Sequence, residues 1–158
     1  MEQEGKKNEV RELFTQYLEE KKCRKTPERY AVLDTIYNRK GHFTADALYE
    51  LLKNDFRVSR ATVYNTLGLL VDAGLVLCHQ FNGVMEYEKC HGVPEHYHQI
   101  CTKCGTVMEF ANEDIRRTVE KSKLRRFRMT HCAVYVYGVC SKCQARANRE
   151  KRKRDSVN

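Results

Sequence analysis

The fold is decided by thirty residues, positions 59–88, SRATVYNTLGLLVDAGLVLCHQFNGVMEYE. Ser59 suits the start of a helix because its hydroxyl can accept from a free backbone N–H. Gly74 suits the end of the same helix because glycine readily adopts the left-handed conformation found there. Two short apolar runs follow, joined by Asn82-Gly83, the dipeptide that most strongly favours a tight hairpin turn. This stretch therefore predicts a helix followed by a two-stranded ribbon.

Three further helices are predicted upstream of this stretch. Apolar residues recur at helical spacing over residues 10–18, a second helix opens at Thr26-Pro27-Glu28, and Thr44 caps a third. Helices followed by a ribbon are typical of a winged helix-turn-helix, in which the ribbon is the wing. We predict such a domain over residues 1–88.

The helix after Ser59 has two different sides. Its buried stripe is predicted to consist of Val63, Leu67 and Leu70. The opposite side carries Arg60 and Tyr64, with Asn65 beside them. A cation, a phenol and an amide on one exposed face are suited to phosphates and base edges.

The second half of the chain predicts a small α/β unit with few strands, so the chain as a whole is predicted to be α+β. Residues 89–95 contain Gly92 and Pro94 and are expected to form a hinge. Strands are predicted at 99–101, 106–110 and 133–139, with a helix at about 112–124, within a domain spanning residues 96–144. Such a small sheet leaves an edge exposed, so we expect a homodimer. Residues 145–158 are strongly basic and are expected to form a disordered tail.

The composition indicates a cytoplasmic protein and limits the chemistry that its cysteines can perform. The 158 residues are 41% apolar and 32% charged, and they contain neither a membrane-length apolar run nor a signal peptide. A cytoplasmic protein keeps its thiols reduced, so the eight cysteines favour metal or thiol chemistry over disulfides. Of the net charge of +8, residues 1–84 contribute only +1, with 13 Lys/Arg against 12 Asp/Glu, and the rest of the chain contributes +7. Charge alone therefore does not locate a DNA-reading element.

Four cysteines form two matched pairs, Cys101-Thr-Lys-Cys104 and Cys140-Ser-Lys-Cys143. Each pair can direct two thiolates at one point, and two pairs supply the four ligands of a closed tetrahedral zinc site. The alternative is a pair of redox-active Cys-x-x-Cys motifs, although such a motif usually stands alone at a helix N-terminus. We predict a structural zinc site that ties the last strand to the first hairpin of the second domain.

A second set of possible ligands combines imidazoles and carboxylates. His96 and His98 alternate along an extended segment, so both rings can point to one side. Glu109 follows on the neighbouring predicted strand, and Glu88 and His42 come from the first domain. Singly these are ordinary surface residues, whereas together they suit Fe(II), Mn(II) or Zn(II). The spacing alone is compatible with either interpretation.

Four motifs occur in a fixed order: TPER at 26–29, RATVYNTL at 60–67, DAGLV at 72–76 and HYHQICTKCG at 96–105. Over residues 10–143 the chain resembles the ferric uptake regulator family of bacterial metal-dependent repressors. The resemblance implies an N-terminal winged helix, a C-terminal dimerisation domain, and binding of inverted-repeat operators in double-stranded DNA.

The resemblance also assigns roles to single residues. Cys101, Cys104, Cys140 and Cys143 match a structural zinc site. A regulatory site drawing ligands from both domains is matched by His42, Glu88, His96, His98 and Glu109. Tyr64 matches a DNA-contacting tyrosine, and Arg24 matches a basic residue that approaches DNA. Together with Arg60 and Asn65 these form the expected DNA-binding set.

Departures from the family pattern are informative. Members with an additional metal site build it at positions that here hold Glu95, Tyr97 and Arg116, and only His131 is retained. Since an arginine cannot ligate a metal, we predict that this additional site is absent or crippled.

The glutamates at 88 and 109 resemble the iron-sensing branch, which predicts an Fe(II)-responsive repressor of iron homeostasis genes. Peroxide sensors of the family prefer aspartates there. Cys90 resembles a ligand of zinc-sensing members. A zinc-uptake or peroxide-sensing regulator, with Zn(II) or Mn(II) as the regulatory metal, is therefore the alternative. We expect Cys90 to be a loop thiol that does not ligate, and His79 to lie on the surface of the wing.

Two classes outside the family would also use such residues, a zinc-dependent enzyme and a thiol oxidoreductase. A catalytic zinc keeps an open coordination position, whereas four thiolates close theirs. The second ligand set has no evident general base beside it. We therefore predict that the chain is not an enzyme.

Overall fold

The computed structural model describes residues 2–155, and the side chains of residues 5–154. The chain divides into two compact units, residues 1–93 and 94–158. The division falls inside the segment expected as a hinge. Within the described residues, no helix has the length and apolar character needed to cross a membrane.

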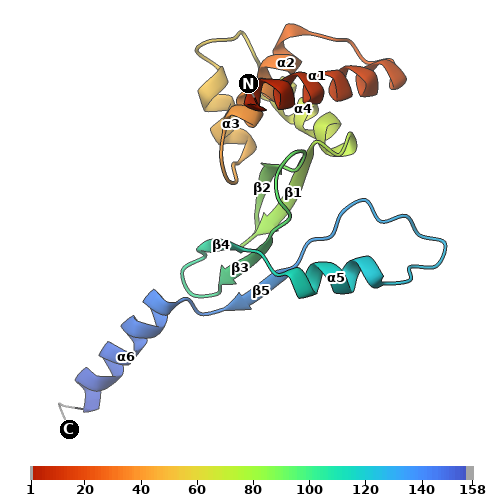
Figure 1. The fold of residues 1–158 in the computed structure, drawn as a ribbon. Helices are drawn as coiled ribbons and strands as arrows, with labels where there is room; N and C mark the ends of the chain where they lie inside the picture. Colours follow the sequence, from red (N-terminus) through yellow and green to blue (C-terminus); the bar gives the residue numbers. More distant parts are fainter. Residues whose placement is uncertain (1, 156–158) are drawn as a thin grey trace. The chain divides into compact units, whose positions relative to one another are not determined.

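Four helices and a hairpin make up the first unit (Figure 1). The elements are α1 (Glu2–Glu20), α2 (Pro27–Asn38), α3 (Ala45–Leu52), α4 (Arg60–Asp72), β1 (Val76–Phe81) and β2 (Val84–Lys89). Their order is the one that the sequence predicts for a winged helix-turn-helix.

The predicted caps begin and end the helices. Thr44 Oγ1 accepts from the Ala47 N–H at 3.2 Å at the start of α3, and Ser59 Oγ accepts from the Thr62 N–H at 3.1 Å at the start of α4. These hydroxyls satisfy N–H groups that have no partner inside the helix. Gly74 follows α4 with φ +70°, the left-handed conformation expected there.

The hairpin turn also follows the sequence. Asn82 and Gly83 both have positive φ, +50° and +82°, which is what a type I′ turn requires. The antiparallel register then runs from Phe81 opposite Val84 to Val76 opposite Lys89.

The two units differ in how much apolar surface they bury. All members of the main core cluster lie in the first unit, and every helix contributes, with Phe14, Val32, Leu48 and Leu67 among them. Each large side chain contributes roughly 1.5–3 kcal/mol. Among the described residues of the second unit, the buried apolar side chains are Tyr97, Ile100 and Cys101. The small core of the second unit therefore contributes less to its stability than the core of the first unit does.

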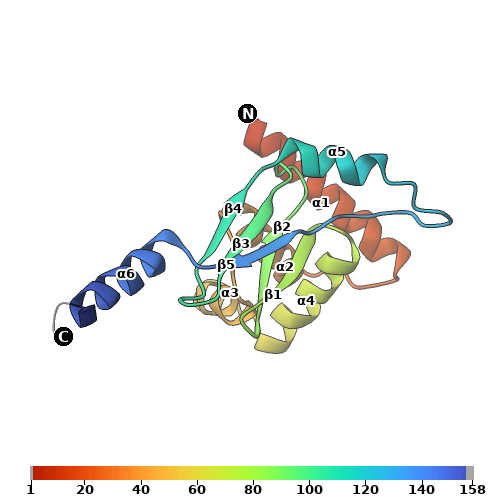
Figure 2. The same cartoon turned by 90° about the horizontal axis from the view of Figure 1, so that it is seen from below.

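A three-stranded sheet and two helices make up the second unit. The elements are β3 (Tyr97–Cys101), β4 (Val107–Phe110), α5 (Glu113–Lys121), β5 (Tyr135–Gly138) and α6 (Ser141–Asp155). Figure 2 shows β3 between β4 and β5. β4 is antiparallel to β3 and β5 is parallel to it.

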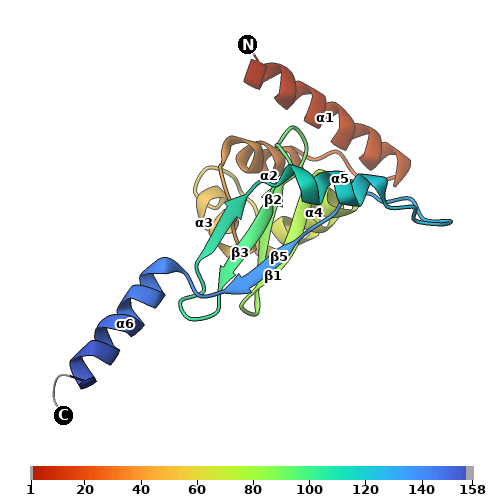
Figure 3. The ribbon, with the colours of Figure 1, turned by 60° about the horizontal axis from the view of Figure 1, so that its bottom comes forward.

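Helix α6 corrects the expectation of a disordered tail over residues 145–158. Ala145, Ala147 and the long basic side chains favour helix, and Arg146 pairs with Glu150 one turn later at 3.2 Å. The basic residues in the last turn suit the negative end of the helix dipole. Figure 3 shows α6 leading away from the sheet of its own unit. Residues 156–158 lie outside the described part.

Candidate metal sites and DNA-contacting face

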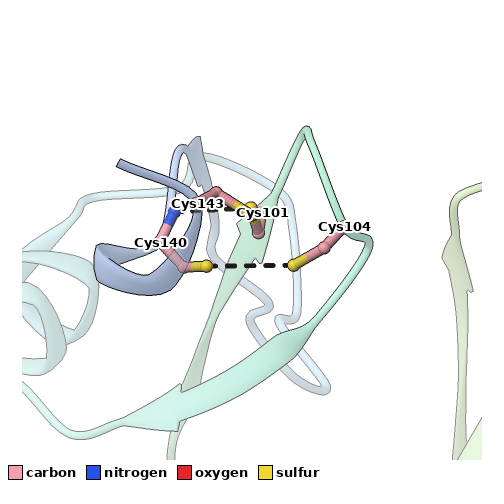
Figure 4. A group of neighbouring side chains, drawn as sticks. All are labelled: Cys101, Cys104, Cys140 and Cys143. Carbon is pink, nitrogen blue, oxygen red and sulfur yellow. Dashed lines mark hydrogen bonds between the residues drawn. The ribbon is translucent and has the colours of Figure 1, made fainter. Parts of the chain in front are cut away.

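The four paired cysteines meet in the second unit (Figure 4). Cys101 ends β3, Cys104 lies in the turn toward β4, Cys140 directly precedes α6, and Cys143 lies in its first turn. Their sulfurs lie within 4.8 Å of one another, with Cys104 Sγ 3.8 Å from Cys140 Sγ. Sulfurs held tetrahedrally at about 2.3 Å from zinc are roughly 3.8 Å apart. The cluster therefore fits a closed zinc site.

Parallel pairing is what brings the two cysteine pairs together. β5 runs beside β3 with Gly138 opposite Cys101, so the chain leaves β5 next to the turn that holds Cys104. The Cys140 N–H donates to Cys101 Sγ at 3.3 Å.

Hydrogen bonds shift the pKa values of the cysteine thiols in different directions. The N–H groups of Cys140, Cys104 and Lys103 lower the pKa of the Cys101 thiol to about 6. The Thr106 hydroxyl, 3.2 Å from Cys104 Sγ, lowers the pKa of the Cys104 thiol. The pKa of the Cys143 thiol is raised to about 12, because Cys140 and Cys104 share its proton. A metal ion must displace such protons, as expected for thiolate ligands.

In the first unit, a short backbone bridge brings two of the predicted regulatory ligands together. The Phe43 N–H donates to the Tyr87 carbonyl at 2.9 Å, and the Tyr87 N–H donates back at 2.8 Å. The bridge places His42 beside Glu88, and His42 Nε2 lies 3.4 Å from Glu88 Oε2.

The prediction that His79 lies on the wing surface is wrong. Its side chain is only 3% exposed. It lies on β1 diagonally across the hairpin from Glu88, and His79 Nε2 is 2.5 Å from Glu88 Oε1. Its ring stacks on Phe81 with centroids 5.3 Å apart. The strand period offers a signal, because residues 79 and 81 share a face and Phe81 is an inward-facing aromatic.

The second unit supplies the other three predicted ligands. His98 on β3 is buried and lies directly opposite Glu109 on β4. The rings of His96 and His98 are 5.0 Å apart, and a His96 nitrogen lies within 4.8 Å of a Glu109 oxygen. His96 Nδ1 is 3.1 Å from the Pro94 carbonyl. Since a carbonyl only accepts, Nδ1 carries the proton and Nε2 keeps the lone pair that a metal needs.

Cys90 is engaged by the backbone of the first unit. Its thiol donates to the Gly74 carbonyl at 2.9 Å. Burial raises the pKa of Cys90, and the nearby Glu88 carboxylate raises it further. Both effects favour the neutral thiol over the thiolate that would ligate a metal.

Arg116 places a positive charge at one position of the additional metal site described above. The Arg116 guanidinium donates to Glu113 Oε2 at 2.9 Å and to Glu120 Oε1 at 2.5 Å along α5. Tyr97 is 1% exposed in the core of the unit. A fixed guanidinium at this position offers a positive charge and no lone pair.

The predicted DNA-contacting residues lie on the surface of the first unit. Tyr64 is 48% exposed on α4, and Arg24, Arg60 and Asn65 are also exposed. Arg60 is held by α3: it forms an ion pair with Asp46, lies 3.7 Å from Glu50 Oε1 and packs over the Tyr49 ring at 4.6 Å. The candidate reading face, which consists of Arg60, Tyr64 and Asn65 on α4, thus presents a tyrosine and an amide beside an arginine that is already paired.

A cluster of four cysteines, separate nitrogen and oxygen donors, and a helix with an exposed polar face are the features of a metal-responsive regulatory protein. The model of the Ferric uptake regulator family matches residues 20–137. The chain belongs to this family.

Individual relatives carry different names. The Ferric uptake regulation protein of Campylobacter jejuni subsp. jejuni serotype O:2 is 34% identical over 136 residues, covering 84% of this chain and 87% of the relative. The Peroxide operon regulator of Bacillus subtilis (strain 168) is 32% identical over 133 residues, covering 83% and 91%. Because these identities are nearly equal, they do not fix the sensed signal.

A solved structure supports the fold. The Helicobacter pylori ferric uptake regulator, described as having three functional metal binding sites, matches with a TM-score of 0.69 at 20% identity. The match covers 87% of this chain and 93% of the other. The mixed helix and sheet architecture predicted from the sequence is thereby confirmed.

Proposed function

We propose that this chain is a cytoplasmic repressor that binds inverted-repeat operators as a homodimer when Fe(II) joins the donors of its two units. The proposal rests on one observation: within each unit, the predicted donors already lie close together. His42 and Glu88 meet in the first unit, and His96, His98 and Glu109 gather in the second. Imidazole and carboxylate donors in this combination suit Fe(II), Mn(II) or Zn(II).

A bound divalent ion would supply one fixed charge toward which all five donors converge. The segment around residues 89–95 then loses freedom, because donors on both sides of it are held. In a dimer this limits the separation of the two α4 helices, so that they can enter successive major grooves on one face of DNA. Tyr64 and Asn65 would contact base edges, while Arg24 and the basic α6 attract phosphates.

Fe(II) is favoured over the zinc-uptake alternative by the state of Cys90. A zinc-sensing ligand set that includes Cys90 needs its sulfur as a thiolate, whereas this thiol donates to the Gly74 carbonyl. The remaining donors are nitrogen and oxygen atoms. The two carboxylates are glutamates, which favours iron sensing over the peroxide-sensing alternative, whose members prefer aspartates there. We also propose zinc for the four-cysteine cluster, which fits its sulfur spacing, and no third metal, because Arg116 is a fixed cation.

The exposed apolar surface of the second unit supports the homodimer. β5 lies at the edge of the described sheet, and all four of its residues are exposed. Large apolar side chains are exposed on this strand, among them Val136 and Tyr137, and on the loop before it, among them Leu124 and Phe127. A sheet edge with exposed apolar side chains is normally covered by a partner, and a second copy is the simplest one.

The deciding experiment is an operator-binding titration under anaerobic conditions with Fe(II), Mn(II) or Zn(II), using protein whose thiolate site carries zinc. Wild type should bind only when an exchangeable ion is present, and Fe(II) should act at the lowest free concentration. His42→Ala should lose the response. His91→Ala is the matched control, since His91 is a half-buried histidine of the same unit that contacts Glu9 instead. Equal binding by wild type stripped of exchangeable metal would contradict the proposal.

A further inference from the structure

His79 and Glu88 form a buried pair inside the wing. Their side chains are 3% and 5% exposed, and neither the reading face nor the thiolate cluster uses them. One donor atom from each of His42, His79 and Glu88 lies within 4.8 Å of the others. Three such groups could all bind one ion, or one of them could orient another.

The two contacts of the Glu88 carboxylate have different lengths. Ligands held at about 2.1 Å from a metal and separated by a tetrahedral angle are roughly 3.4 Å apart. The distance from His42 Nε2 to Glu88 Oε2 is 3.4 Å, which fits two ligands of one ion. The distance from His79 Nε2 to Glu88 Oε1 is 2.5 Å, a direct hydrogen-bonding contact that leaves no room for an ion holding both atoms at tetrahedral spacing.

Phe81 packs against the rings of both histidines, but in different orientations. Its ring lies 5.3 Å from the ring of His42 and 5.3 Å from the ring of His79, and it is parallel to the latter within 11°. The stack fixes the plane of the His79 ring, so its Nε2–H points along the wing at one oxygen of Glu88.

We propose that His79 is a positioning residue for the regulatory metal and not one of its ligands. It donates to Glu88 Oε1, so that Oε2 remains turned toward His42 as the metal-binding oxygen. The inference rests on the proposed function, because it concerns the same regulatory ion. Hydrogen bonds to ligating carboxylates are a general means of orienting them, and their loss typically costs about 10–100-fold in metal affinity.

The test compares His79→Gln with His79→Ala in full-length protein whose thiolate site carries zinc. Glutamine can still donate from its amide at a similar reach, but it is a poor metal ligand. Co(II) is the probe, because its visible absorption reports the number and kind of ligands, and competition with a chelator gives its affinity. Thermal unfolding without Co(II) checks that each variant folds, with His42→Ala and His91→Ala as comparison variants.

We expect His79→Ala to weaken Co(II) binding by about 10–100-fold, and His79→Gln to bind nearly as tightly as wild type. At saturation both should show the wild-type Co(II) spectrum. If both variants are weak and both spectra change, His79 is a ligand and the inference fails. It also fails if His79→Ala binds like wild type while His42→Ala is weak. If His42→Ala itself binds like wild type with an unchanged spectrum, the proposed regulatory site fails as well.

Discussion

Arg60 shows how a single residue can be held back from DNA by its own domain. Its guanidinium pairs with Asp46 and approaches Glu50, so a phosphate has to compete with these carboxylates. Asp46→Ala should therefore raise affinity for DNA of any sequence and steepen the dependence on salt by about one phosphate contact. Filter binding over a salt series measures both. Asp55→Ala removes the same charge from the turn after α3, and an equal effect there would contradict this role of Asp46.

Tyr64 is the residue on which sequence recognition should depend. It is 48% exposed on α4, so its removal costs the fold little. Tyr64→Ala should weaken operator binding by about 1–3 kcal/mol and leave binding to random DNA nearly unchanged. Tyr64→Phe separates the ring from the hydroxyl. Competition assays with operator and scrambled duplexes give the ratio, and equal losses on both would show that Tyr64 contacts only the backbone.

At the residue scale, the sequence predicts what depends on local chemistry. Thr44, Ser59 and Gly74 have their predicted conformations, because a cap is decided by one side chain and its own backbone. The predicted pair of His42 and Glu88 also meets, but through the Phe43–Tyr87 bridge, which no local pattern indicates. The burial of His79 is missed because an imidazole by itself fits either face of a strand, and its one indicator is the inward-facing Phe81 two residues later on the same face.

At the scale of elements, the sequence predicts neither the pairing of β5 nor the helix α6. The paired Cys-x-x-Cys spacing does predict that the four cysteines meet, and their sulfurs lie together. The sequence does not predict that β5 pairs in parallel with β3, because strand neighbours are chosen by tertiary packing. The helical character of α6 escapes prediction because a low apolar content is typical of disordered segments. Its alanines and its Arg146–Glu150 pair favour a helix without burial.

Cys140→Ser tests whether the thiolate cluster holds the second unit together. That unit buries few apolar side chains, and structural zinc sites supply much of the folding free energy of small domains. The variant should carry about one zinc fewer per chain and lose the unfolding transition of residues 94–158. The first unit, with its own core, should still unfold cooperatively. Elemental analysis with calorimetry measures both, and Cys23→Ser is the control. Unchanged zinc content and melting would contradict a structural role.

At the scale of the whole molecule, the proposed switch is a coupling between ion and operator. If holding five donors favours the DNA-binding arrangement, then DNA must tighten ion binding by the same factor that the ion tightens DNA binding. That factor is roughly 5–150-fold for typical allosteric couplings. Fe(II) affinity measured with and without operator duplex, and operator affinity measured with and without Fe(II), should give equal ratios. His42→Ala should bring both ratios toward one, because it removes a donor without altering the reading face. An operator that leaves Fe(II) affinity unchanged in wild type would show that the ion held by these donors does not control DNA binding.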